Sequence, residues 1–337
     1  MTTRTAIVGI LGCGVTGGKV AQYVAGAGVR VAIHDPAPAG IESVVRRTKG
    51  VRVEQPLDLA VCDVVVVASP APHAARVGEL LRLGVNVVSV GDDLADTRHL
   101  LDLHETAVAS GARLVVGAGL APGLSGLLAR HLSRRLDTLD ELHVAVHGTA
   151  GPACARQHHE NLGSTSLGWH DGEWTEPPGG SGRDLVWFPE PIAAHDCYRA
   201  ALCDPLLLHR SFPTAVRISA RTSATRRDRV TARLPMLTPP HAGGDLGAVR
   251  VEARGGLVGG ARHTVIAGAS GATGELAGSV AAAVAVQLLR HPSADSVAPG
   301  VHLTSDEVID LLDVLHVATT MGVRVQEFTG VARATHW

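Results

Sequence analysis

The chain has 337 residues, of which 45% are apolar, so it is long enough to bury a large core and to form two globular domains. Its 30 basic and 32 acidic residues leave a formal net charge of −2, which argues against nucleic acid or an anionic membrane surface as a partner. The five cysteines are odd in number and form no Cys-x-x-Cys pair, which argues against a disulfide framework and a zinc site and favours a reducing, cytoplasmic setting.

The first predicted element is an apolar strand that runs into a glycine-rich turn. Residues 6–17 read AIVGILGCGVTG, with Gly-x-Gly-x-x-Gly at the junction of a strand and a helix. Gly12 permits the sharp turn, Gly14 removes a Cβ that would block a diphosphate, and Gly17 lets the helix pack closely on the strand. The pattern predicts a dinucleotide site, against the alternative of a plain glycine-rich turn. The expected cofactor contacts here are Gly12, Cys13, Gly14, Val15, Thr16 and Gly17.

The next elements extend this pattern. A helix is expected from Val15 to Gly28, followed by a strand over 29–35 that ends in Asp35. A carboxylate at this place accepts hydrogen bonds from the adenosine ribose and repels a 2′-phosphate, so Asp35 favours NAD over NADP. NADP stays open, because Arg46, Arg47 and Lys49 lie one helix further on. The alternative role of Asp35 is that of a solvated loop acid or a helix cap.

Strands and helices keep alternating up to about residue 120, which predicts a doubly wound parallel sheet, the Rossmann arrangement. Strands are expected over 62–68, 85–90 and 113–116, with helices ending near 83 and 110 between them. In such sheets ligands bind at the carboxyl ends of the strands. Further cofactor contacts are therefore expected at Ser69, Pro70, His73, Gly91 and Asp92, although His73 fits a helix start equally well. Gly119, Pro122 and Gly123 are the expected substrate contacts, since a helix that begins at this turn could present its amides to a carboxylate or a carboxamide; a plain strand-to-helix connector is the alternative.

Beyond Leu124 the pattern changes to a second, α+β domain built on a mostly antiparallel sheet. A helix to about Arg135 and a strand over 141–147 precede a long irregular stretch. Further strands are expected over 215–221, 229–234, 247–254 and 262–269, and helices over 273–289 and 305–315. The apolar run 277–289 is too short to span a bilayer and predicts a buried helix. The expected division is a dinucleotide-binding domain over 1–123, a substrate and dimerisation domain over 124–271, and C-terminal helices over 272–337 that return to the first domain.

Proton donors are hard to rank from the sequence, because 18 histidines make chance pairs common. The catalytic candidates are His158, His159 and Tyr198, and a packing role competes for Tyr198. A metal site at His158, His159 and Glu160 is disfavoured, because adjacent histidines diverge and no second cluster has ligand spacing. Trp169, Trp174, Trp187, Phe188 and Tyr198 are concentrated within thirty residues, where they could wall a substrate pocket or cover an interface.

Two motifs carry a family resemblance. Asp92-Asp93 follows a strand and precedes a helix that contains LHETA at 103–107, and Gly117-x-Gly119-x-x-Pro122-Gly123 leads into the next helix. With the glycine-rich turn, these segments resemble the saccharopine dehydrogenase-like oxidoreductases. The resemblance implies an NAD(P)-dependent enzyme that interconverts an imine and an amine, commonly on an amino-acid substrate. Members that bind a carboxylate-bearing amino acid often have Asp before the Pro-Gly pair, whereas this chain has Ala121.

The sequence therefore predicts a two-domain NAD(P)-dependent oxidoreductase that transfers hydride to or from a C–N bond of a small amine or amino-acid-derived substrate. Two alternatives remain open: a reductase of a C=C bond or ketone, and a non-catalytic NAD(P)-binding sensor or partner subunit. A metal-dependent hydrolase is disfavoured by the histidine spacing. No signal peptide is expected at the start of the chain, and a homodimer is the expected assembly, through a face or edge of the second sheet.

Overall fold

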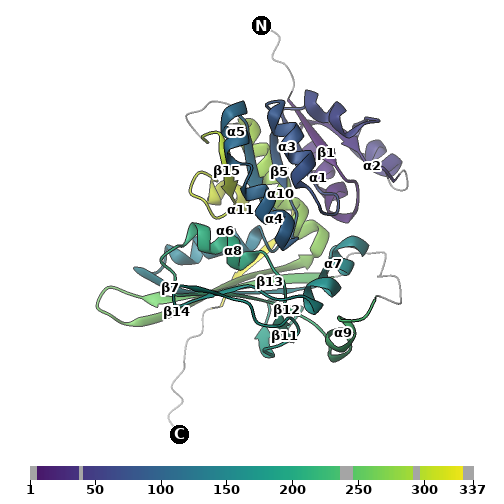
Figure 1. Ribbon diagram of the computed structural model, residues 1–337. Coiled ribbons are helices and arrows are strands. Elements are labelled where there is room, and N and C mark those ends of the chain that lie inside the picture. The colour runs from purple at the N-terminus through teal and green to yellow at the C-terminus, as the bar shows by residue number, and fades with distance from the viewer. Residues whose placement is uncertain (1–5, 38–40, 236–245, 291–296, 329–337) are drawn as a thin grey trace.

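The computed structural model of the protein describes residues 6–37, 41–235, 246–290 and 297–328, which form two sheets stacked one above the other in Figure 1. The upper sheet has the strand order β15-β6-β5-β4-β1-β2-β3, and every neighbouring pair in it is parallel. Its strands are β1 (Ile7–Leu11), β2 (Arg30–His34), β3 (Val51–Arg52), β4 (Val64–Val67), β5 (Asn86–Ser89), β6 (Arg113–Val116) and β15 (Gly300–Leu303).

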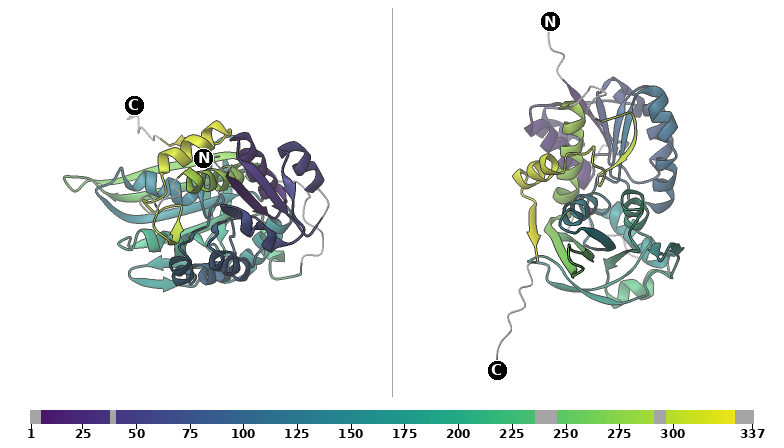
Figure 2. Two further views of the ribbon diagram at one scale, coloured as in Figure 1. Left: turned by 90° about the horizontal axis from the view of Figure 1, so that it is seen from above. Right: turned by 90° about the vertical axis from the view of Figure 1, so that its left-hand side faces the viewer.

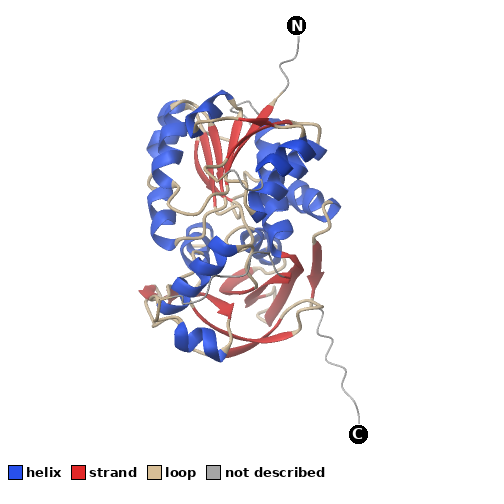
Figure 3. Cartoon of the chain, turned by 90° about the vertical axis from the view of Figure 1, so that its right-hand side faces the viewer, coloured by secondary structure: helices blue, strands red, loops and turns tan. Residues whose placement is uncertain are grey.

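Helices cover both faces of the parallel sheet, as Figure 3 shows. They are α1 (Val15–Gly26), α2 (Ile41–Thr48), α3 (Ala74–Arg82), α4 (Leu94–Leu101) and α5 (His104–Ser110), with a 3₁₀-helix, η1 (Pro56–Val61). Burial on both faces explains the unbroken valine run of β4, whose four residues are at most 1% exposed. The predicted doubly wound parallel sheet is confirmed. The helix expected to continue to Ser110 is two helices, because the chain turns at Asp102 and Leu103.

The lower sheet has the order β10-β11-β12-β7-β13-β14-β16, with β8 added beside β12 and β9 beside β8. Its pairs are antiparallel except β12 with β7, so the expectation of a mostly antiparallel sheet is confirmed. The strands are β7 (Thr138–His147), β8 (Gly168–His170), β9 (Glu173–Thr175), β10 (Asp184–Trp187), β11 (Ala194–Arg199), β12 (Arg217–Ser223), β13 (Leu246–Gly256), β14 (Arg262–Ala272) and β16 (Arg324–Glu327).

Helices α6 (Leu124–Ser133) and α8 (Asp204–Ser211) lie between the lower and the upper sheet, while α7 (Pro152–Gly163) and α9 (Arg226–Thr231) lie to one side (Figure 1). The strand expected over 229–234 is wrong, because this segment belongs to α9 and the turn after it. Thr225 and Asp228 form a capping box in which each side chain accepts from the other residue's amide, and this starts a helix.

Helix α10 (Thr273–Arg290) joins the two halves and is seen in both views of Figure 2. It packs closely on α1, because a Cβ on Gly278 would lie only 2.7 Å from Lys19 Cβ, and Lys19 Nζ pairs with Glu275 Oε1 at 2.8 Å. The prediction of a buried helix over 277–289 is confirmed. None of the helices in the described ranges is long and apolar enough to cross a membrane.

The helix expected from Ser305 begins later, as α11 (Leu311–Thr320), because Asp310 is its N-cap and accepts from the amides of Leu312 and Asp313. Residues 305–310 form a turn against Arg130, whose guanidinium donates to the carbonyl oxygens of Asp306 and Ile309. The chain after α10 thus contributes β15 to the upper sheet, α11 against α10 and β16 to the lower sheet.

Candidate active site

The glycine-rich turn lies between β1 and α1, and each of its three glycines meets a different constraint. Gly12 has φ +98°, and a Cβ there would lie 2.5 Å from the Ser69 amide nitrogen. A Cβ on Gly17 would collide with the Gly12 carbonyl oxygen, so the first turn of α1 packs directly on the loop. A Cβ on Gly14 would meet no atom within 4 Å, because this position faces a cleft. Gly12 and Gly17 therefore allow close packing, and Gly14 leaves open space in the cleft.

Asp35 follows β2 and holds the glycine-rich turn from the side. Its Oδ2 accepts from the Cys13 amide at 2.5 Å, and its Oδ1 accepts from the Ala37 amide at 2.7 Å. The carboxylate therefore lies within reach of the turn, on the border of the cleft. This is the place from which an acid can receive the hydroxyls of an adenosine ribose.

The cleft has a volume of about 500 Å³ and lies between the carboxyl ends of the parallel strands and the second half of the chain. Eleven of the residues expected to contact cofactor or substrate line it: Gly12, Gly14, Val15, Thr16, Asp35, Ser69, Pro70, Gly91, Asp92, Gly119 and Pro122. Cys13, Gly17, His73 and Gly123 are not among the residues that line it.

His73 supports the cleft from behind. Its side chain is buried, with Nδ1 2.9 Å from Ser89 Oγ and Nε2 2.7 Å from the Ser69 carbonyl oxygen. Burial lowers the pKa of His73, so the ring is neutral near neutral pH. Contrary to the sequence-based expectation, His73 does not face the cleft; it fixes the loop that carries Ser69 and Pro70.

The turn over 119–123 is closed by its own backbone. The Gly119 amide donates to the Pro122 carbonyl, the Leu124 amide to the Gly119 carbonyl, and the Gly123 amide to Ser125 Oγ. The amides that were expected to receive a substrate carboxylate are thus engaged within the loop. Gly119, Leu120, Ala121 and Pro122 still form one wall of the cleft.

The opposite wall is the start of α7, a helix that was not expected from the sequence although His158, which lies on it, was a catalytic candidate. Gly151 and Pro152 begin this helix, and residues 148–154 with Arg156, Gln157 and His158 line the cleft. A proline at the first helical position is a helix-start signal that is readable in the sequence, but its position opposite the glycine-rich turn follows only from the fold. Among the described residues that line the cleft, Arg156 is the one Lys or Arg.

The three catalytic candidates lie in different places. His158 faces the cleft, half-buried, with Nδ1 3.2 Å from Thr222 Oγ1, and burial lowers its pKa. His159 faces away and bonds through Nε2 to the Leu234 carbonyl oxygen at 3.0 Å. Tyr198 is 1% exposed in the core, with the Arg229 guanidinium 5.1 Å from its ring centre. Of the three, His158 is the one that reaches the cleft.

Two further groups that line the cleft, Asp92 and Cys154, have shifted pKa values. Burial, with the nearby charges of Asp93 and Asp204, raises the pKa of Asp92 to about 6. Burial raises the pKa of the Cys154 thiol to about 12, so it is protonated at neutral pH. Within the described ranges no group of three or more His, Cys, Asp or Glu side chains could hold a metal ion. Trp169, Trp174, Trp187, Phe188 and Tyr198 do not line this cleft.

The protein is similar to known proteins in its three-dimensional structure. No protein-family model and no curated protein matches the sequence. The fold is similar to that of apo saccharopine dehydrogenase (L-Glu forming) from Saccharomyces cerevisiae, with a TM-score of 0.71 and 14% identity over 96% of this chain and 100% of that chain. It is also similar to a variant of a meso-diaminopimelate dehydrogenase from Clostridium tetani E88, solved with DAP, with a TM-score of 0.51 and 13% identity over 91% and 95% of the two chains. The fold is thus saccharopine dehydrogenase-like.

Proposed function

We propose that this chain is an NAD(P)-dependent oxidoreductase that transfers hydride to or from a C–N bond of a small amine or amino-acid-derived substrate. The observation that carries the proposal is the cleft, in which the glycine-rich turn and Asp35 lie opposite His158 and Arg156. One wall has the features of a dinucleotide site, and the other offers a proton-transferring group and a cation.

The residues present fit a dinucleotide. The open space at Gly14 accommodates a diphosphate, and the first intrahelical bond of α1, from the Gly18 amide to the Gly14 carbonyl, leaves the preceding amides of the helix for an anion. Asp35 would receive the ribose hydroxyls, which favours NAD over NADP. Bound there, the nicotinamide supplies the hydride chemistry, and the protein supplies orientation and proton transfer.

His158 is the candidate for proton transfer at the substrate nitrogen. Its lowered pKa keeps the imidazole neutral near neutral pH, so it can accept a proton from an ammonium group before oxidation, or return one after reduction. Thr222 Oγ1 orients the ring through Nδ1, and Nε2 remains for the substrate side. Arg156 is the candidate partner of a substrate carboxylate, since guanidinium groups bind carboxylates through paired hydrogen bonds.

The choice of a C–N bond rests on the motif resemblance at residues 88–128 and on the fold shared with the saccharopine dehydrogenase from Saccharomyces cerevisiae. The first substrates to test are mixtures of an amine, such as lysine or another amino acid, with a 2-oxo acid. The two form an imine in solution, which His158 as a neutral base and Arg156 as a guanidinium would bind.

Two measurements on the purified protein test the proposal. The first is a fluorescence titration with NADH and NADPH, in which we expect saturable binding and a preference for NADH. The second is the loss of NADH absorbance in the presence of mixtures of amines and 2-oxo acids. Binding without turnover on any C–N, ketone or C=C substrate would favour the sensor alternative, and failure to bind either nucleotide would reject the proposal.

A further inference from the structure

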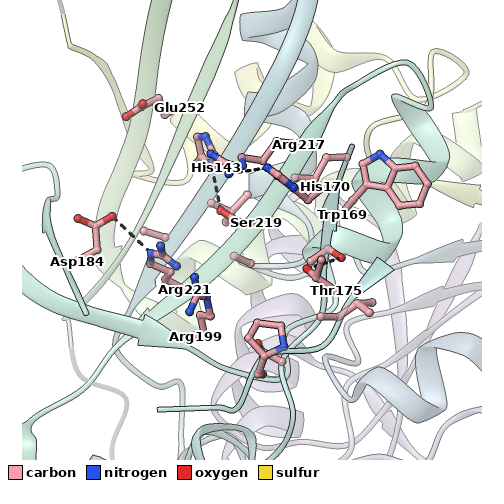
Figure 4. Close-up of a pocket in the computed structure, with 18 of the residues that line it drawn as sticks. His143, Trp169, His170, Thr175, Asp184, Arg199, Arg217, Ser219, Arg221 and Glu252 are labelled. Atoms are coloured by element: carbon pink, nitrogen blue, oxygen red, sulfur yellow. Dashed lines mark hydrogen bonds and ion pairs between the residues drawn. The ribbon is translucent and has the colours of Figure 1, made fainter. Parts of the chain in front are cut away.

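A second cavity, of about 620 Å³, lies on the lower sheet and is drawn in Figure 4. It is a different site from the cleft. On β7 and β12, Val146 and Thr222 border the cleft, whereas the neighbouring residues Ala145 and Arg221 border this cavity. Successive side chains of a strand point to opposite faces, so the two cavities occupy opposite faces of the same sheet.

Strand register sets three arginines in one row across the floor of this cavity. Arg199 on β11 lies directly opposite Arg221 on β12, Arg221 pairs with Ala145 on β7, and Ala145 pairs with Arg250 on β13. Ala145, between Arg221 and Arg250 in this row, borders the cavity, and it is 4% exposed and packs in an apolar cluster with Val186 and Cys197. Figure 4 shows Arg199 and Arg221 on the same side of the cavity, with Asp184 reaching Arg221 from its edge.

The row is incompletely neutralised. Arg250 Nη2 pairs with Glu252 at 2.6 Å, and Arg221 Nε is 3.5 Å from the exposed carboxylate of Asp184. The described part of the chain gives the Arg199 guanidinium only a hydroxyl contact, with Ser181 Oγ at 3.5 Å, and gives the buried Nε of Arg250 no hydrogen-bond partner. Like charges directly opposite each other destabilise a sheet, so this arrangement costs stability unless an anion is bound.

Taken together, the described residues that line the cavity carry a net positive charge. Five arginines border the cavity, Arg199, Arg217, Arg221, Arg250 and Arg254, against the carboxylates Glu176, Asp184 and Glu252. Arginines remain in excess even when Glu141, which pairs with Arg254, is added. Arg217 contacts the ring of His170 at 2.7 Å. A concave site with a net positive lining concentrates anions.

We propose that this cavity binds a small anion with a phosphate or carboxylate group, held by Arg199, Arg221 and Arg250. Guanidinium groups suit such ligands because their planar donors match two oxygens at once. The size of the cavity exceeds that of a single phosphate group, so the anionic group belongs to a larger metabolite. Two probes distinguish the possible ligands: inorganic phosphate represents phosphorylated ligands, and malonate represents dicarboxylates.

The test is calorimetric titration of the full chain with phosphate and with malonate, at an ionic strength held constant with NaCl. We expect one binding event per chain with at least one probe, weakened at least about tenfold by Arg199→Gln and by Arg221→Gln, since each removes a charge-assisted contact. Arg221→Lys, which keeps the charge, should retain more affinity than Arg221→Gln. Binding of phosphate alone assigns a phosphorylated ligand, and binding of malonate alone assigns a dicarboxylate.

Two control variants separate this site from other anion sites. Arg183→Gln removes an exposed arginine of the same domain that pairs with Asp196, and it should leave anion binding unchanged. Arg156→Gln changes the cleft, where phosphate could also bind. The proposal is overturned if neither probe binds above the NaCl reference, or if Arg156→Gln rather than Arg199→Gln abolishes binding.

Sedimentation and NADH titration complete the test. Sedimentation shows whether the protein is a dimer in the absence of an anion. If it is, and if Arg221→Gln dissociates it, a second copy covers this face and the proposal is overturned. NADH affinity should be the same in Arg199→Gln as in the unmodified protein. Loss of anion binding in Arg199→Gln, in a protein that fails to bind NADH, would support this site while rejecting the proposed function.

Discussion

The amide nitrogen of Cys13 donates a hydrogen bond of 2.5 Å to Oδ2 of Asp35, which ties the glycine-rich turn to the end of the neighbouring strand. Twenty-two residues separate the two in sequence, and the parallel pairing of β1 with β2 brings them together. Asp35 therefore has two roles in the proposed site: it fixes the backbone that would face a diphosphate, and its carboxylate borders the place of the ribose.

Replacement of Asp35 by alanine should weaken NADH binding by at least about tenfold, because hydrogen bonds to a charged group contribute roughly 1.5–3 kcal/mol. NADPH binding should weaken less, since the variant no longer repels a 2′-phosphate. Fluorescence titration measures both. Glu79→Ala is the matched control, as Glu79 is a surface acid on α3 that pairs with Arg76. Equal losses for NADH and NADPH would show that Asp35 supports the turn but does not select the cofactor.

Gly14 and Gly17 should respond to alanine in opposite ways. Gly14 has φ −68° and open space at the Cβ position, so Gly14→Ala should change the free energy of unfolding by less than about 1 kcal/mol yet weaken NADH binding. Gly17→Ala meets the Gly12 carbonyl and should cost about 3 kcal/mol of stability. Urea denaturation and NADH titration separate the two effects. Unchanged NADH affinity in a folded Gly14→Ala variant would place the dinucleotide elsewhere.

The parallel sheet was predictable because its signals are local. Each buried strand is an apolar run, and each is bounded by a turn or a helix cap within a few residues, as at Asp93, whose side chain accepts from the Asp96 amide. The edge strand β15 was missed, because Gly300–Leu303 is only four residues long and its partner β6 lies far back in the chain. Pairing over such a distance is decided by tertiary packing, and its sequence pattern is too short to reveal it.

The structure of the second half of the chain was less predictable, because it too depends on tertiary packing. The segment over 229–234 has alternating residues that fit a strand, yet the capping box at Thr225 and Asp228 begins a helix before it. In the cleft, the glycine-rich side carried a motif, whereas His158 and Arg156 came from a helix whose location depends on the whole sheet. Tyr198 shows the converse: a chemically suitable side chain that the fold buries in the core.

Asp92 gives a prediction for pH. Its pKa is raised to about 6 by burial and by Asp93 and Asp204, so the folded protein holds this proton more tightly than the unfolded chain does. The free energy of unfolding should therefore fall as pH rises from about 4 to about 6, and this loss of stability persists at neutral pH. Asp92→Asn should stabilise the protein by roughly 1–3 kcal/mol near neutral pH and have little effect near pH 4.

Denaturant titrations at the two pH values test this prediction, with Asp102→Asn at the exposed end of α4 as the control. Because the charge of Asp204 contributes to the shift at Asp92, the double variant with Asp204→Asn should gain less than the sum of the two single variants. A stabilisation by Asp92→Asn that is equal at both pH values would contradict the assignment of this ionisation to Asp92.

His158 and His159 are adjacent on α7, and the proposed function gives them different outcomes. Once a substrate is identified, His158→Gln should lower kcat by about 100-fold, the usual scale of general acid–base catalysis, while NADH affinity stays within about twofold. His159→Gln removes the contact to the Leu234 carbonyl and the charge effect of His159 on the pKa of His158; kcat should stay unchanged near neutral pH, where burial already keeps His158 neutral. The pH profile of kcat adds a second readout. The inflection that marks protonation of the His158 imidazole, whose pKa is lowered by burial, should disappear in His158→Gln. Equal kcat values for the two variants would exclude His158 as the proton-transferring group and direct attention to Asp92 across the cleft.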